Sequence, residues 1–206
     1  MATIKVRGHG SVEVRADEAV LTFEAVAVAP AAADAFAAAS ERAALLDEVL
    51  DDAGIEPARR STLGVVLQEH HELDGAGQPR RTHRASTTVN VRMTEPDAIP
   101  AVLAAVVERS GAYVRGPHWR AADTTEAASE ACRRAVADAR GRAESYAGAL
   151  GVRLGRVTSV DEVAAGDFGP VHPPVRAMAA AVPAAVHPAE LAVSAIVDIV
   201  FELADD

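Results

Sequence analysis

The sequence has few aromatic residues, one lysine and one cysteine, and each shortage excludes a class of protein. Aromatic residues are 3% of the 206, so small alanine and valine side chains must fill the core, which allows helices to pack close to a sheet. A single cysteine, Cys132, excludes an intrachain disulfide, and we expect it to be buried in a helix. The net charge of -10 disfavours a nucleic-acid partner.

Long apolar runs are also missing. Charged residues interrupt each apolar stretch before the roughly 20 residues that span a bilayer, so we expect no membrane insertion. A signal peptide has a basic part followed by an apolar part, and the segment Met1–Gly10 lacks this pattern. On this basis the sequence predicts a cytoplasmic protein.

The N-terminal part has the order strand, strand, helix. Alternation in Ile4–His9 and β-forming residues in Val20–Val28 predict two strands, which we interpret as a hairpin. Pro30 ends the second strand, and apolar residues at helical spacing predict a helix over Ala31–Ala53 that stops at Gly54.

The same order then repeats. Thr62–Leu73 and Thr82–Met93 are strand-like runs separated by turn-forming residues, and a helix is predicted over Asp97–Ser110 with a stop at Gly111. The second of these strands alternates between apolar and polar residues, which indicates that one face of the sheet is wet.

A fifth strand, Val114–Ala121, precedes a long helix over Thr124–Leu150. Its alanine stripe would let it lie close to the sheet, and Gly141 in its middle indicates a tight contact or a bend. A sixth strand, Val152–Val163, is followed by a Pro- and Ala-rich loop at about 164–189. The final run, Leu191–Leu203, alternates most clearly.

These elements predict an α+β fold. The repeated strand–strand–helix order with short turns favours a mainly antiparallel sheet with helices on one side, the long Ala-rich third helix packed on one face. The simplest organisation is a single domain over residues 1–206.

Several motifs resemble one known family, the SIMPL domain. They are Val6, Gly8, Gly10 and Asp17 near the N-terminus, Gly54 and Ile55 after the first helix, the run from Ala135 to Val157, and Pro188 and Glu190 before the last strand. The resemblance implies no agreed enzymatic activity and no catalytic residues to carry over. It also implies that some periplasmic members form ring-like or channel-like homo-oligomers, and many relatives look periplasmic or secreted.

No catalytic, cofactor or metal site is predicted. His70, His71 and His83 could approach one another across the second hairpin, but adjacent strand residues point to opposite faces, and no metal-binding spacing is present. Gly8 and Gly10 superficially resemble a phosphate loop; because they lie in a strand, close backbone approach or a bulge explains them better.

The strongest functional expectation is a homo-oligomer formed through the hairpin Thr62–Met93. Its strands are long for a small domain, and an extended edge readily pairs with another chain. The interface residues that we predict are Leu63, Val65, Leu67, Arg80, Arg81 and Arg84, the arginines setting register. In the competing arrangement, the sixth or the last strand covers this edge within one chain.

The sequence therefore predicts a non-enzymatic scaffold or protein-interaction module. The alternative is a small-ligand or metal-binding module, with possible hydrolytic activity, that uses His70, His83 and neighbouring acids.

Overall fold

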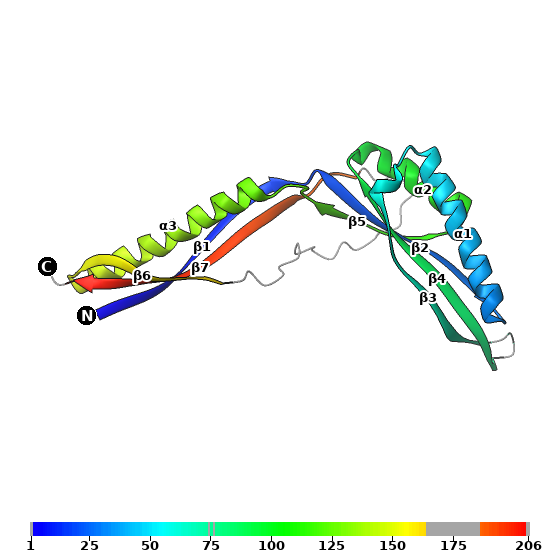
Figure 1. The fold of residues 1–206 in the computed structure, drawn as a ribbon, viewed down its shortest axis with the longest axis horizontal. Helices are drawn as coiled ribbons and strands as arrows, with labels where there is room; N and C mark the ends of the chain where they lie inside the picture. The colour runs from blue at the N-terminus through cyan, green and yellow to red at the C-terminus, as the bar shows by residue number, and fades with distance from the viewer. Residues whose placement is uncertain (1, 74, 76, 164–185, 205–206) are drawn as a thin grey trace. The chain divides into compact units, whose positions relative to one another are not determined.

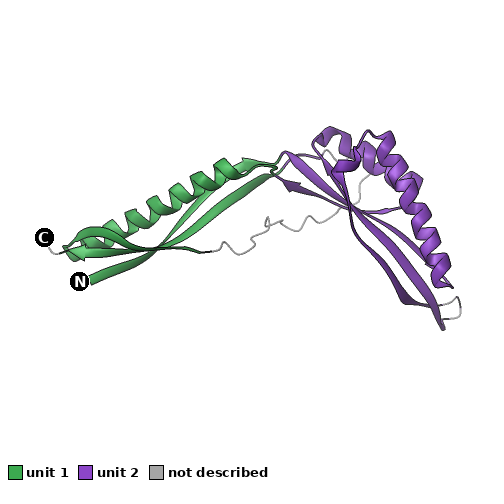
Figure 2. Cartoon of the chain, in the orientation of Figure 1, with its two compact units in different colours: residues 1–16, 121–179, 189–206 green, residues 17–120, 180–188 purple. Residues whose placement is uncertain are grey.

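The computed structural model describes residues 2–73, 75, 77–163 and 186–204, which form seven strands and three α-helices (Figure 1). They divide into two compact units (Figure 2). The expected single domain over residues 1–206 stays a prediction.

The first unit contains a three-stranded antiparallel sheet. Its order is β1 (Ala2–Arg15), β7 (Glu190–Ala204) and β6 (Arg153–Val163), with β7 in the middle. The predicted hairpin of the first two strands is therefore wrong, since β1 pairs with β7 from Ala2 opposite Leu203 to Arg15 opposite Glu190. Alternation shows that a strand has one covered face, but it does not say which strand is its neighbour.

Helix α3 (Thr125–Leu150) covers one face of this sheet along β1 and β7 (Figure 1). Its buried residues are all alanines: Ala127, Ala131, Ala135, Ala139, Ala143 and Ala147. The predicted close approach is confirmed at Gly10, where a Cβ atom would lie 1.9 Å from the Ala131 carbonyl oxygen. Gly141 makes no such contact, because a Cβ there would meet nothing within 4 Å.

The second unit contains a four-stranded antiparallel sheet. Its order is β3 (Arg60–Leu73), β4 (Pro79–Met93), β2 (Glu18–Ala29) and β5 (Tyr113–Arg120), so β3 and β5 are the edges. The hairpin predicted from the second pair of strands is confirmed, since β3 and β4 pair from Arg60 to Leu73.

Helices α1 (Ala32–Asp52) and α2 (Ile99–Ser110) lie on one face of this sheet (Figure 1). Helix α1 packs over β2 and β4, where Ala27 and Ala85 contact Ala35 and Ala39. Short 3-10 turns at Pro57–Arg59 and Pro96–Ala98 precede β3 and α2. Strand β3 lies at the edge of the sheet, beside the two strands on which α1 mainly packs.

The α+β prediction is confirmed, with antiparallel pairing and the Ala-rich helix on one face. The strand–strand–helix order occurs twice, as β1–β2–α1 and β3–β4–α2, but the strands divide between two sheets. The predicted loop lies between β6 and β7, and its residues 164–185 are outside the described residues.

Candidate interaction edge

Strand β3 exposes apolar side chains along a free sheet edge. The exposed fractions are 60% for Leu63, 55% for Val65, 44% for Val66 and 49% for Leu67. Leu67 lies opposite Ala85, so Leu67 and Val65 share the α1 side of the sheet and Val66 points to the other side. Apolar residues on both faces of one exposed strand are unusual for a surface that only meets water.

The strand is also regular over most of its length. One irregularity lies between Thr62 and Gly64, and from Gly64 to Leu73 every residue of β3 has a partner on β4. Within the described residues β3 pairs with β4 alone. Its other side therefore presents backbone N–H and C=O groups at strand spacing, which is a template for another strand.

The three arginines predicted for the interface lie on the neighbouring strand, β4. Arg84 donates to Glu24 of β2 at 2.9 Å, and Arg81 is 2.8 Å from Glu69 of β3. Arg80 lies opposite Glu72 in the β3–β4 register. The structure thus brings all six predicted residues onto one hairpin, with Arg81 and Arg84 paired to acids of their own sheet.

Two of the other three sheet edges are interrupted. Strand β5 has eight residues, contains Pro117, which lacks an N–H, and has a register shift against β2. Strand β6 has two register shifts against β7, between Leu154 and Val157 and between Val157 and Ser159. Short length, proline and bulges each make an edge a poor template for strand addition.

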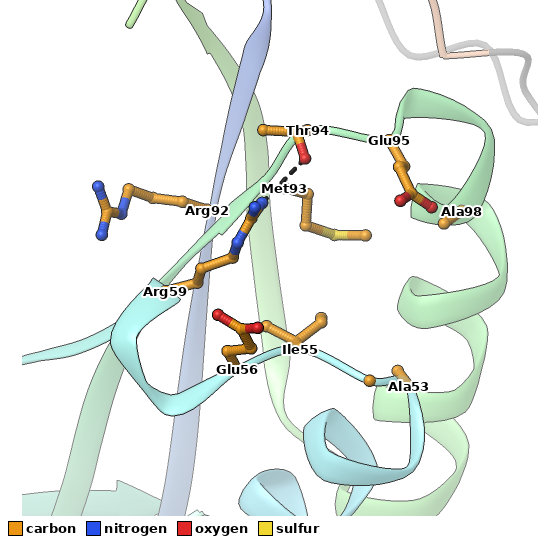
Figure 3. Close-up of a pocket in the computed structure, with 10 residues that line it drawn as sticks. Ala53, Ile55, Glu56, Arg59, Arg92, Met93, Thr94, Glu95 and Ala98 are labelled. Atoms are coloured by element: carbon orange, nitrogen blue, oxygen red, sulfur yellow. Dashed lines mark hydrogen bonds between the residues drawn. The ribbon is translucent and has the colours of Figure 1, made fainter.

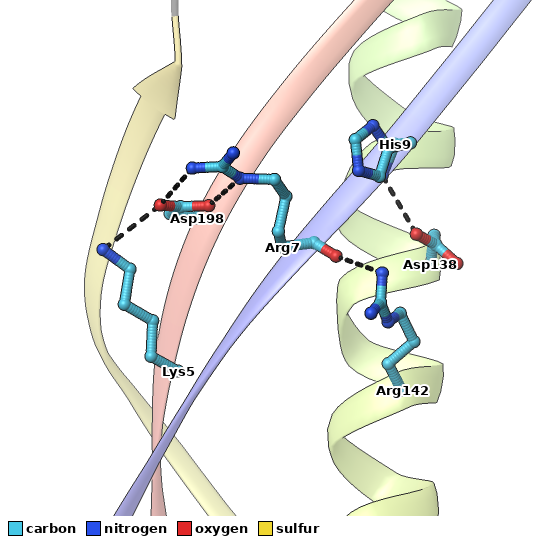
Figure 4. Close-up of polar contacts among 6 residues, drawn as sticks. All are labelled: Lys5, Arg7, His9, Asp138, Arg142 and Asp198. Carbon is cyan, nitrogen blue, oxygen red and sulfur yellow. Dashed lines mark hydrogen bonds and ion pairs between the residues drawn. The ribbon is translucent and has the colours of Figure 1, made fainter.

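The remaining edge, the outer side of β1, is covered by polar side chains of α3 (Figure 4). The His9 N–H donates to Asp138 at 3.0 Å, and the Arg7 carbonyl accepts from Arg142 at 2.9 Å. Arg134 donates to the Ser11 carbonyl at 2.7 Å. We call Arg134, Asp138 and Arg142 the edge-covering side chains, because they occupy the groups that a further strand would need.

Sequence reasoning missed these side chains, although a signal was present. Each lies one residue before a buried alanine, at Ala135, Ala139 and Ala143. A polar stripe at the same spacing as the alanine stripe runs along the flank of the helix and meets the strand beside it. Val66 was also missed, because only one face of β3 was considered.

A buried carboxylate lies on the other face of the β1–β7–β6 sheet. Asp198 accepts two hydrogen bonds from Arg7, at 2.7 and 3.0 Å, and lies 3.1 Å from the Lys5 ammonium (Figure 4). The hydrogen bonds from Arg7 hold the pKa of Asp198 well below its usual range. This cluster joins β1 to β7.

A pocket of about 280 Å³ lies between the C-terminal end of α1, the end of β4 and the start of α2 (Figure 3). Arg59 donates to the Thr94 hydroxyl at 2.9 Å across it, and Glu56 and Glu95 also line it. Its charges are balanced between two arginines and two glutamates. The lining residues include no histidine, cysteine or serine, and the one hydroxyl group, that of Thr94, accepts the hydrogen bond from Arg59.

The histidines of the hairpin do not gather. His71 is 3.4 Å from Glu69, His70 is 4.0 Å from Glu72, and the His83 ring lies 3.1 Å from the Pro30 carbonyl oxygen. Among the described residues there is no group of three or more His, Cys, Asp or Glu that could hold a metal ion. Cys132 is exposed, contrary to expectation, because it lies beside the buried alanine stripe.

None of the described helices is long and apolar enough to cross a membrane. Among known proteins, the chain is 30% identical to the uncharacterized protein YggE of Edwardsiella ictaluri over 154 residues. The matched region covers 74% of the chain and 64% of that relative. The chain is 30% identical over 168 residues to the 26 kDa periplasmic immunogenic proteins of Brucella melitensis and Brucella abortus, covering 79% of the chain and 67% of each relative.

The chain thus spans about two thirds of the length of these relatives. Residues 4–201 match the model of the SIMPL family, whose description is a protein of unknown function. The match includes both units and every strand and helix, at least in part. The chain belongs to the SIMPL family.

Proposed function

We propose that this chain is a non-enzymatic scaffold that self-associates through the outer edge of β3. The observation that carries the proposal is the contrast between β3, whose edge is long, regular and apolar, and β1, whose edge is occupied by α3 side chains. Among the described residues, three polar side chains of α3 protect the long edge of β1, and the long edge of β3 is left open for pairing.

The apolar surface that β3 can bury sets the expected affinity of self-association. Val65, Val66 and Leu67 are about half exposed, so burying the rest of each stabilises a contact by on the order of 1 kcal/mol. Association costs about 4–15 kcal/mol in lost translational and rotational freedom. Backbone pairing and the partner's own apolar surface must supply the remainder, so we expect a concentration-dependent assembly in roughly the micromolar range.

Light scattering of the full chain over a dilution series from about 1 mM to about 1 µM tests the proposal. The weight-average mass should fall on dilution. The double variant Val65→Lys, Leu67→Lys should shift the assembly toward monomer, because the bulky charges cannot be buried beside another strand. Val160→Lys is the matched control, since Val160 is an exposed valine on β6, whose edge is interrupted.

Three outcomes are decisive. A monomeric mass at every concentration overturns self-association. An oligomer that is unchanged in the β3 variant, while that variant melts like the parent, moves the interface away from β3. Loss of the oligomer in the Val160→Lys control points to β6 instead.

The compartment is a separate proposal. The sequence predicts a cytoplasmic protein, whereas the Brucella relatives are named as periplasmic proteins. Cell fractionation of the native host with marker proteins for each compartment decides between them. Recovery of the chain with periplasmic markers would overturn the cytoplasmic proposal and leave the β3 proposal untouched.

A further inference from the structure

The edge that best fits the open side of β3 is β3 of a second copy. In the described part of the chain, the other edge strands are interrupted or covered: β5 and β6 have register shifts, and β1 is covered by α3. A second copy therefore offers one long, regular and unoccupied strand, which is β3 itself. Pairing of a strand with its own equivalent is an isologous contact, which closes as a two-fold dimer.

Symmetry and charge together favour one direction for the pair. In a parallel pair the two-fold axis would run along the strands and turn the second sheet over, so equivalent residues at one level would point to opposite faces, whereas neighbouring residues in a ladder point to the same face. Glu69 and Glu72 lie toward the end of β3, and the apolar Val65–Leu67 precede them. Antiparallel pairing places these glutamates toward opposite ends of the ladder, so the antiparallel direction is favoured.

The geometry of an antiparallel two-fold limits the register further. The axis stands perpendicular to the sheet, so it keeps both α1 helices on the same face. Residues that lie opposite each other in the ladder must point to the same face. Because successive residues of a strand point to opposite faces, the axis must pass beside one residue of β3 and its own equivalent, and not between two residues. In the regular segment that begins at Gly64, the possible centres near the apolar residues are Val65, Val66, Leu67, Gln68 and Glu69.

One centre matches apolar to apolar residues at Val65, Val66 and Leu67, the three apolar positions of the regular segment. With Val66 on the axis, Val65 lies opposite Leu67 of the second copy and Val66 lies opposite its own equivalent. A centre at Val65 would instead oppose Val66 to Gly64, and Leu67 to Leu63, which lies in the irregular stretch between Thr62 and Gly64. A centre at Leu67 opposes Val65 to Glu69, and a centre at Gln68 opposes Leu67 to Glu69. A centre at Glu69 opposes that carboxylate to its own equivalent. These pairs follow from the order of residues in β3. The Val66 centre also places Leu63 opposite Glu69, but Leu63 lies in the irregular stretch before Gly64, outside the regular ladder.

We propose that β3 pairs antiparallel with β3 of a second copy about a two-fold axis at Val66. The inference rests on the proposed function and adds its partner and register. The pair joins two four-stranded sheets edge to edge, with Gly64 opposite Gln68 at either side of the apolar centre. The two copies of Glu69 then lie six residues apart along the ladder, which is about 20 Å. That separation exceeds the screening length of about 8 Å at physiological salt.

Disulfide trapping tests this register. Opposite Cα atoms in an antiparallel pair are about 4.5–5.5 Å apart, which is within the range of a disulfide. In a Cys132→Ser background, which removes the exposed native thiol, Val66→Cys should form a covalent dimer under mild oxidation. The product is read as a dimer mass on a non-reducing gel and in mass spectrometry, and it should disappear on reduction.

The flanking positions provide matched controls. Gly64→Cys alone and Gln68→Cys alone should link at least about tenfold more slowly than Val66→Cys, because neither lies opposite its own equivalent. An equimolar mixture of these two variants should link to each other. The Cys132→Ser parent should give no dimer band. Thermal melting of each reduced variant confirms that it is folded before oxidation.

The outcomes separate this inference from the proposed function. If light scattering detects a β3-dependent oligomer but Val66→Cys does not link faster than the flanking variants, the register is wrong and the proposed function stands. Faster self-linking of Gln68→Cys moves the axis to residue 68. If the chain is monomeric at every concentration, both the proposed function and this inference are overturned.

Discussion

A Cβ atom on Gly8 would lie 2.0 Å from the carbonyl oxygen of Ala135. The backbones of β1 and α3 therefore approach each other so closely that no side chain fits between them at Gly8. The alanines of α3 make the contact possible from the helix side, and glycine makes it possible from the strand side. Neither residue type would suffice alone, which ties the N-terminal motif of the chain to its Ala-rich helix.

Gly8→Ala should therefore destabilise the first unit. The added methyl group meets backbone atoms that cannot rotate away, and overpacking of this kind costs typically about 1–3 kcal/mol, occasionally more. We expect a lower denaturant midpoint by circular dichroism. Gly141→Ala, on α3 of the same strand–helix pair, is the control, and it should be neutral or raise stability by up to about 1 kcal/mol. Equal destabilisation by both substitutions would contradict the close-contact explanation.

Stability should depend on pH through Asp198. Its native pKa is lowered, first by the hydrogen bonds from Arg7, so ionised Asp198 stabilises the fold above the unfolded pKa of about 3.9. This contribution is lost as the pH falls toward the lowered native pKa. Asp198→Asn should therefore melt below the parent at pH 7, and the difference should shrink below about pH 4.

Thermal melts of both proteins from about pH 3 to pH 7 measure this difference. Glu13→Gln, which removes an exposed carboxylate from β1, should show little difference at any pH. A gap between Asp198→Asn and the parent that is constant with pH would mean that the carboxylate acts through its shape rather than its charge.

Removing the edge-covering side chains should expose a second pairing edge. In the triple variant Arg134→Ala, Asp138→Ala, Arg142→Ala, the backbone groups of Arg7, His9 and Ser11 lose their partners on α3. We expect a larger mass in light scattering, or precipitation, that persists when Val65 and Leu67 are also replaced by lysine.

The control triple is Arg133→Ala, Arg140→Ala, Glu144→Ala. It also removes two arginines and one acid from α3, so the change in net charge is the same. These side chains pair with acids or arginines of α3 itself, at Glu130 and between Arg140 and Glu144. If both triples increase the mass equally, loss of helix surface charge and not exposure of β1 is responsible.

Replacing His70, His71 and His83 by glutamine should change neither folding nor metal content. The three rings lie near separate partners, Glu72, Glu69 and the Pro30 carbonyl oxygen. Elemental analysis of the parent and the triple variant is the measurement. Stoichiometric zinc in the parent and none in the variant would revive the metal-binding alternative.

Much of the local structure could be predicted from periodicity, and the pairing of strands could not. The spacing of alanines identified α3, and glycines at 54, 111 and 151 identified the helix ends to within about two residues. The partner of β1 was missed because its alternation is equally compatible with β2 beside it in the chain and with β7 at the other end. Local patterns constrain the face of a strand, whereas pairing depends on non-local packing.

The candidate edge shows the same division. Leu63, Val65 and Leu67 could be singled out because they are apolar residues in a strand-like run followed by charge. The side chains that cover the edge of β1 could not be predicted from the sequence, because they depend on which side of α3 meets the strand. Arg134, Asp138 and Arg142 look like ordinary surface residues of a helix until β1 is placed beside them.

The pairing of β1 with β7 also bears on the order in which the chain folds during synthesis. Every strand of the β3–β4–β2–β5 sheet has been made once Arg120 has emerged, so that sheet needs nothing that follows. Strand β1 is made before the other described strands, yet Arg7 and its partner Asp198 are separated by 191 positions. Among the described strands, β1 therefore waits for β7, and in that interval α3 is the described element that packs along it and covers its edge.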